Sequence, residues 1–157
     1  MALRISRQHV DAIREHGARE YPNECCGIML GSEVDGAKRV RELAPVRNLR
    51  LEQARAQEVL PLAEPQKESE RNRFLMDPKE VTRVEAEART RGLDVIGYYH
   101  SHPDHPARPS EYDREHAWPW ISYVIIRIDE GKPCDYASWV LADDRSRFER
   151  EPITEGD

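Results

Sequence analysis

The chain has 157 residues, of which 38% are hydrophobic and 34% are charged, and its net charge is −6. This length suits one domain with a real hydrophobic core, so we treat residues 1–157 as a single domain. Acidic and basic residues are interspersed, which argues against a nucleic-acid binder with a basic stripe. No apolar run approaches the roughly 20 residues that a membrane span needs. The N-terminus lacks the apolar stretch of a secretory signal, so a cytoplasmic protein is expected.

The first predicted element is a helix that follows Ser6 and runs to about Arg19. Ser6 is a favourable N-cap residue, and Val10 and Ile13 lie on one face of such a helix. Pro22 is expected to end it. The sequence therefore opens with one amphipathic helix.

Two strands joined by a tight turn are predicted next. Residues 25–30 are apolar enough for a buried strand, and Gly31 is expected to close it. Residues 34–37 read Val-Asp-Gly-Ala, which is typical of a hairpin turn. A second strand is expected over residues 39–43.

The cysteines indicate a reducing compartment. Cys25, Cys26 and Cys134 are an odd count with two adjacent members, which makes a poor disulfide framework. Cys25 and Cys26 would point to opposite faces of a strand and so could not share a metal. At least one of them is expected to be a small buried hydrophobe.

Residues from about 49 to 72 differ in composition from the rest. Arg, Glu, Gln and Ala dominate, and Pro61 and Pro65 interrupt the segment. It is interpreted as an insertion that forms a surface helix or a loop, and it either covers a site or is a plain solvated excursion.

The second half alternates helices and strands. Asp77 caps a helix with Pro78 at its first position and Glu80 at the capping-box position, and Gly92 ends it. Its inner stripe consists of Val81, Val84 and Ala88. Further elements are expected as a strand over 93–99 that leads into His100, a helix from Ser110 through Ala117, and strands over 121–128 and 136–141 around a turn at 129–132. The pattern predicts an α/β or α+β fold with a mixed sheet.

His100 and His102 carry the clearest chemical signal. They lie two residues apart at the end of a predicted strand, so their imidazoles project from the same face. Two imidazoles and one carboxylate are a common catalytic zinc site with a fourth position left for water. The carboxylate is either Asp104 or Asp113. The first choice, together with His105, spells a metallo-β-lactamase signature. That fold needs further metal-binding histidines well downstream, and only His116 follows His105, so this alternative is rejected.

The second choice brings in a wider pattern. His100-Ser101-His102-Pro103 is followed after seven residues by Ser110-x-x-Asp113, and Glu24 lies upstream in the context Pro-x-Glu-x-Cys-Gly. Over about residues 10–139 the chain resembles the JAMM, or MPN+, metalloprotease family, and within it the small prokaryotic members. The resemblance implies a cytidine-deaminase-like mixed sheet flanked by helices.

The resemblance also implies a role for each matching residue. His100, His102 and Asp113 match the ligands of one Zn²⁺, Glu24 matches the general base that activates water, and Ser110 matches the serine that stabilises the oxyanion. Each residue has a structural alternative. Ser110 and Asp113 would also make a helix cap, and Glu24 would also suit a strand edge.

Four nearby residues are given lesser roles by the sequence. Asp104 and His105 are expected to be solvent-exposed loop residues. Tyr99 and Trp120 are expected to pack near the site, where either could line a substrate groove.

Relatives of this type hydrolyse peptide or isopeptide bonds after the Gly-Gly tail of a ubiquitin-like protein, and in bacteria the implied partner is a sulfur-carrier protein. Two alternatives belong to other classes. One is a catalytically inactive scaffold domain of the same fold, which the presence of all five motif residues disfavours. The other is a zinc amidohydrolase acting on a small molecule.

Overall fold

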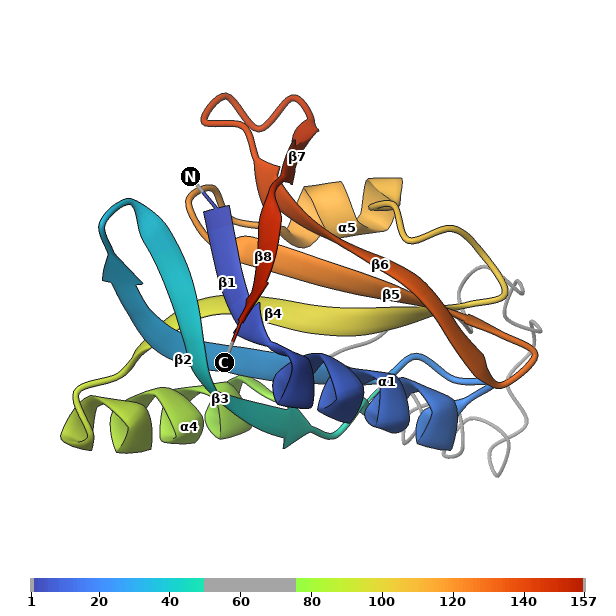
Figure 1. The fold of residues 1–157 in the computed structure, drawn as a ribbon, viewed down its shortest axis with the longest axis horizontal. Coiled ribbons are helices and arrows are strands. Elements are labelled where there is room, and N and C mark those ends of the chain that lie inside the picture. The colour runs from blue at the N-terminus through green and yellow to red at the C-terminus, as the bar shows by residue number, and fades with distance from the viewer. Residues whose placement is uncertain (1, 50–75, 157) are drawn as a thin grey trace, which may run out of the picture.

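The computed structural model describes residues 2–49 and 76–156, and all its described strands belong to one mixed sheet (Figure 1). The order across the sheet is β7-β6-β5-β4-β2-β3-β1-β8. The strands are β1 (Ala2–Ser6), β2 (Cys26–Val34), β3 (Ala37–Val46), β4 (Asp94–Pro103), β5 (Ser122–Asp129), β6 (Lys132–Leu141), β7 (Phe148–Glu151) and β8 (Ile153–Gly156). The helices are α1 (Arg7–Glu20), α4 (Pro78–Thr90) and α5 (Glu111–His116). The predicted mixed α/β architecture is confirmed.

The sheet is curled so strongly that its two edge strands approach each other. β7 and β8 lie at opposite ends of the strand order, yet only Pro152 separates them along the chain. The Pro152 carbonyl accepts a 2.9 Å hydrogen bond from the Leu3 amide of β1. The Tyr136 hydroxyl of β6 also contacts the Glu155 carboxylate of β8. The curl therefore gives the sheet a concave inner face and a convex outer face.

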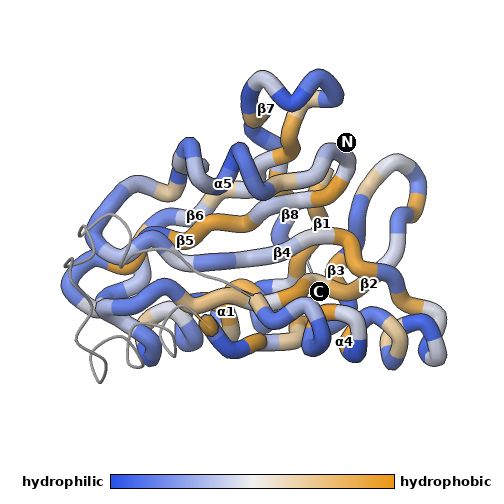
Figure 2. Tube along the Cα trace, turned by 180° about the vertical axis from the view of Figure 1, so that it is seen from behind, coloured by the Kyte–Doolittle hydropathy of each residue, from blue (hydrophilic) through white to orange (hydrophobic). Residues whose placement is uncertain are grey.

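Each face buries a separate apolar cluster. Val10 and Ile13 of α1 pack on the inner face with residues such as Met29 of β2. Ala88 of α4 packs on the outer face against Ile28, the neighbour of Met29 in sequence. Alternate residues of one buried strand thus serve both layers. Figure 2 shows β2 and β5 as largely hydrophobic and α5 as hydrophilic.

The predicted helix starts are confirmed. The Ser6 hydroxyl accepts from the His9 amide at 3.1 Å, and the Asp77 carboxylate accepts from the Lys79 amide at 3.0 Å. The helix predicted from Ser110 is also present, with its cap at that residue. These local signals act within one turn, so the sequence suffices to predict them.

Strand boundaries were predicted less well. Gly31 does not close its strand: β2 continues to Val34, with a register shift between Leu30 and Gly31. A Cβ atom on Gly31 would lie 1.8 Å from the Arg39 carbonyl oxygen, so the glycine allows a close approach of two strands. β3 extends beyond the predicted 39–43 at both ends. The turn between β2 and β3 is confirmed, with positive φ at its central residues.

Strands β1, β7 and β8 were not predicted at all. The insertion predicted over 49–72 falls almost entirely outside the described residues. Cys25 and Cys26 are both buried, as at least one was expected to be, and burial raises the pKa of Cys25 to about 12. Among the described residues, the helices are all too short or too polar to cross a membrane.

Candidate metal centre

His100 and His102 lie near the end of β4, a central strand of the sheet. β4 pairs with β2 on one side and with β5 on the other, so both histidines sit in the best-supported part of the sheet. They are 1% and 2% exposed. Because side chains alternate along a strand, both face outward with Tyr98, while Tyr99 and Ser101 face the inner core.

A backbone carbonyl fixes the tautomer of His102. Its Nδ1 atom lies 2.8 Å from the Pro106 carbonyl oxygen, which can only accept a hydrogen bond. The proton therefore sits on Nδ1, and in the neutral ring the lone pair of Nε2 points toward His100 and Asp113. This is the orientation that a metal ligand needs.

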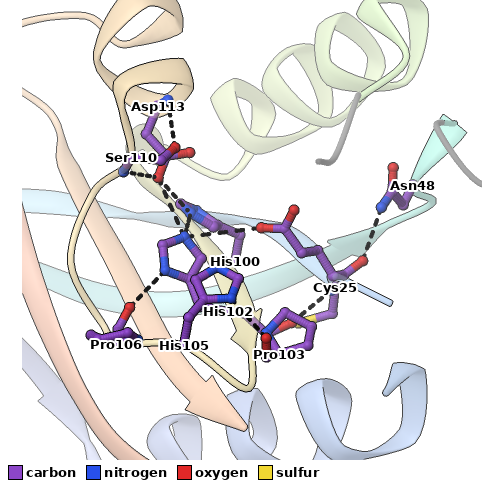
Figure 3. A network of polar contacts seen from close by, with 11 residues as sticks. Cys25, Asn48, His100, His102, Pro103, His105, Pro106, Ser110 and Asp113 are labelled. Atoms are coloured by element: carbon purple, nitrogen blue, oxygen red, sulfur yellow. Dashed lines mark hydrogen bonds and ion pairs between the residues drawn. The ribbon is translucent and has the colours of Figure 1, made fainter. Parts of the chain in front are cut away.

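Three donor atoms converge in front of β4 (Figure 3). The Nε2 atoms of His100 and His102 are 3.1 Å apart, and the Asp113 Oδ2 atom lies 3.3 Å from the first and 3.4 Å from the second. Bonds of about 2.0–2.1 Å to a tetrahedral zinc ion place its ligand atoms about 3.3–3.4 Å apart. The donor set and its spacing fit a zinc ion.

A helix cap positions Asp113. The Ser110 hydroxyl accepts a 3.0 Å hydrogen bond from the Asp113 amide, and the Ser110 amide donates a 2.8 Å hydrogen bond to Asp113 Oδ2. Burial raises the pKa of the Asp113 carboxyl, but His100, His102 and the Ser110 amide outweigh it, so the pKa falls well below its usual range. Capping and metal binding are thus compatible in one residue.

Glu24 approaches the same point from the segment between α1 and β2. Its carboxylate is buried, at 3% exposure, and its Oε1 atom lies 4.0 Å from His102 Nε2. Glu24, His100 and His102 also form a group that could hold a metal ion. Asp113 Oδ2 is closer to both imidazoles, so we place Asp113 rather than Glu24 in the ligand set. The greater distance of Glu24 suits a group that acts on a water molecule beside the metal.

A mainly apolar groove of about 390 Å³ leads away from the site. His100 and Asp113 are among the residues that line it, whereas Glu24 and His102 are not. It runs between α4 and α5 over β4 and β5. Its other walls are formed by Met76, Pro78, Val81, Thr82, Tyr98, Pro109, Tyr112, His116, Trp118, Tyr123, Ile125 and Phe148.

The predictions for the four nearby residues had mixed outcomes. Asp104 is exposed, as predicted, but it accepts hydrogen bonds from the Tyr21 hydroxyl and the Glu130 amide. His105 is half-buried rather than exposed, and its ring lies 4.4 Å from that of His102. Tyr99 does not line the groove, because it faces the inner core and pairs with His16. Trp120 is 73% exposed and lies outside the groove lining.

Sequence reasoning missed the residues that support the site. The Pro106 carbonyl, the Ser101 hydroxyl and the Asn48 amide each bind a part of it, yet none carries a chemical signature of its own. Of these, only Ser101 lies inside a recognisable motif, between the two histidines. That position was the one available signal.

Comparison with known proteins gives one family. The family described as prokaryotic homologs of the JAB domain matches residues 6–142. A desampylase of Haloferax volcanii is 33% identical over 117 residues, covering 74% of this chain and 70% of the relative. A probable TtuB-protein conjugate cleaving protease of Thermus thermophilus is 26% identical over 129 residues, covering 82% and 72%. A solution structure from Salinibacter ruber has 37% identity and a TM-score of 0.69, covering 98% of this chain and 92% of that one.

Proposed function

Because the chain belongs to the prokaryotic JAB (JAMM/MPN) family and is a hydrolase, we propose that it is a zinc-dependent metallopeptidase. Its substrate would be a peptide or isopeptide bond after the C-terminal Gly-Gly tail of a ubiquitin-like sulfur-carrier protein. The observation that carries the proposal is the convergence of His100, His102 and Asp113 at 3.1–3.4 Å, with Glu24 alongside.

His100, His102 and Asp113 would hold one zinc ion through two Nε2 atoms and one carboxylate oxygen. In the neutral form of His102 the proton on Nδ1 leaves the Nε2 lone pair available to the metal, beside the Asp113 carboxylate. When bound, zinc would acidify a water molecule and polarise the scissile carbonyl.

Glu24 would act as general base and then as general acid. Its buried carboxylate takes a proton from the attacking water and delivers it to the amine as the carbon–nitrogen bond breaks. A base within reach of its proton contributes about 10²–10⁴-fold to the rate. The charge returns to the carboxylate once the amine leaves.

Ser110 would stabilise the oxyanion through its hydroxyl hydrogen. Its oxygen already accepts from the Asp113 amide, so that contact uses a lone pair and leaves the O–H free to donate. One such donor is worth about 3 kcal/mol in a tetrahedral transition state. The cap and the catalytic role therefore use different parts of one hydroxyl.

The substrate class rests on the family and on the names of two relatives. One of these names describes cleavage of TtuB-protein conjugates. A carrier tail could reach the site as an extended strand, and glycines suit a confined path because they lack side chains. The presence of all five motif residues disfavours the alternative of an inactive scaffold.

The test combines metal analysis with cleavage. The purified protein is expected to hold one zinc per chain, and to cut a ubiquitin-like carrier whose Gly-Gly tail is joined to a lysine peptide, as measured by intact mass. Dipicolinate should abolish the cleavage and added zinc should restore it. A zinc protein that cleaves acetylated amino-acid amides but no carrier conjugate would identify a small-molecule amidohydrolase instead. A protein that binds zinc and cleaves neither would be a scaffold.

A further inference from the structure

The peptide bond that follows Glu24 is hydrogen-bonded at both ends by side chains. Glu24 lies in the irregular segment between α1 and β2, and β2 begins only at Cys26. The position of its carboxylate is therefore not set by a regular strand. Something else must hold this segment against the metal ligands of β4.

Two side chains from separate parts of the fold hold the peptide group. The Asn48 amide, which follows β3, donates from Nδ2 to the Glu24 carbonyl oxygen at 3.0 Å. At the other end of the same peptide group, the Cys25 N–H donates to the Ser101 hydroxyl at 2.8 Å. Ser101 is 0% exposed and Asn48 is 9% exposed, and Figure 3 shows Asn48 directed at this segment.

We propose that Ser101 and Asn48 are positioning residues that set the Glu24 carboxylate by clamping the peptide group after it. The proposal rests on the proposed role of Glu24 as the base. The plane of this peptide group fixes ψ of Glu24, and with it the direction in which its side chain leaves the backbone. A misplacement of about 1 Å at a reacting group can cost on the order of 10²-fold in rate.

The place of Ser101 explains why one strand can organise both halves of the site. It lies between His100 and His102, so the ligands face outward while its hydroxyl reaches inward to Cys25. The Ser101 amide also donates to the Cys25 carbonyl at 3.2 Å. Residues 100–102 thus supply the two histidine ligands and also bind the backbone next to Glu24, which fixes the distance between the ligands and the base.

The inner face offers a matched serine that does not touch the site. Ser138 of β6 is also 0% exposed, and its hydroxyl donates to Glu151 at 2.9 Å. Like Ser101→Ala, Ser138→Ala removes a buried serine hydroxyl from the inner core. It therefore controls for the general effect of losing a buried hydroxyl.

The experiment measures Ser101→Ala, Asn48→Ala and Ser138→Ala, each with and without Glu24→Gln, on the carrier–lysine peptide conjugate. We expect Ser101→Ala and Asn48→Ala each to lower kcat about tenfold, with unchanged KM and zinc content, because a clamp acts on the geometry of the base. In the Glu24→Gln background neither should lower kcat further, since there is no base left to position. Ser138→Ala should leave kcat unchanged in both backgrounds.

A second measurement does not depend on turnover. In the metal-free protein, Ser101→Ala should speed hydrogen exchange of the Cys25 amide about five- to tenfold, as loss of one hydrogen bond predicts. Unchanged kcat and unchanged exchange would overturn the inference, as would an equal loss of kcat in the Glu24→Gln background. Full activity of Glu24→Gln itself would instead remove the proposed base. If Ser101→Ala does not fold, Asn48→Ala decides on the same criteria.

Discussion

Two buried polar clusters lie on opposite faces of the same sheet, and they differ in how their charges are balanced. On the inner face, Lys38 Nζ donates to Glu151 at 2.8 Å and to Ser122 at 2.8 Å. The Ser122 and Ser138 hydroxyls donate to the other Glu151 oxygen at 2.6 and 2.9 Å. This cluster contains its own cation, and both oxygens of its carboxylate accept hydrogen bonds.

The outer cluster is built differently. The two Nε2 atoms and Asp113 Oδ2 lie 3.1–3.4 Å apart, and Glu24 Oε1 lies 4.0 Å from His102 Nε2, so this cluster joins two imidazoles and two carboxylates. A buried charge is tolerated when it is paired or when it binds a metal. Equal burial thus has two interpretations: the inner cluster pairs its carboxylate with a lysine, whereas we propose that the outer cluster binds a metal cation.

The largest expected effect comes from removing a ligand. His102→Ala should lose the bound zinc and essentially all turnover, because two donors remain where a catalytic zinc site uses three. Metal analysis of the purified variant checks this.

His105→Ala is the matched control. Its ring packs 4.4 Å from that of His102 but contributes no atom to the converging set, so zinc should be retained. Equal zinc content in His102→Ala and the parent protein would contradict the proposal that the outer cluster, unlike the inner one, binds a metal.

The next effect separates metal binding from catalysis. Glu24→Gln should keep one zinc while kcat falls by about 10²–10⁴-fold, since glutamine has the size of glutamate but cannot accept the proton. Glu111→Gln, an exposed carboxylate on α5, should leave kcat unchanged. Parent-like turnover of Glu24→Gln would show that proton transfer uses another group.

A substitution in the inner cluster should instead lower the free energy of unfolding. Lys38→Met leaves Glu151 buried without its cation, and breaking a buried pair in this way costs about 3–5 kcal/mol of unfolding free energy. Urea denaturation measures the loss. Zinc content and kcat per folded molecule should stay at the parent values.

A paired substitution sharpens this test. Lys38→Met with Glu151→Leu removes both charges, so it should recover much of the lost stability. A Lys38→Met protein that is fully stable but has lost zinc would mean that the inner cluster serves the metal centre.

The sequence predicted the part of the candidate site whose proposed roles are chemical. The five motif residues have side chains suited to metal binding or proton transfer at recognisable spacings, and the structure brings all five together. The supporting residues were missed because their role depends on partners far along the chain. Asn48 is 24 residues from Glu24, Ser101 is 76 from Cys25, and Lys38 is 113 from Glu151.

The same reason explains which elements of the fold were missed. Helix starts at Ser6, Asp77 and Ser110 depend on contacts within one turn, and all three were predicted. β7 and β8 are four residues each, read Phe-Glu-Arg-Glu and Ile-Thr-Glu-Gly, and have no alternating apolar pattern. They become strands because the curled sheet provides neighbours for them, as β1 does for β8.

The smallest expected effect concerns two exposed tryptophans that follow α5. Trp118 lines the groove that begins at His100 and Asp113, and it is 66% exposed. Trp120, two residues on, is 73% exposed and lies outside the groove lining. If the groove binds substrate, Trp118→Ala should raise KM about five- to tenfold with kcat unchanged, because it removes binding that ground state and transition state share. Trp120→Ala should leave both constants at the parent values and change the unfolding free energy by less than about 0.5 kcal/mol. Equal effects of the two substitutions on KM would assign substrate binding to the whole exposed loop rather than to the groove, and no effect of either would leave the groove outside the path of the substrate.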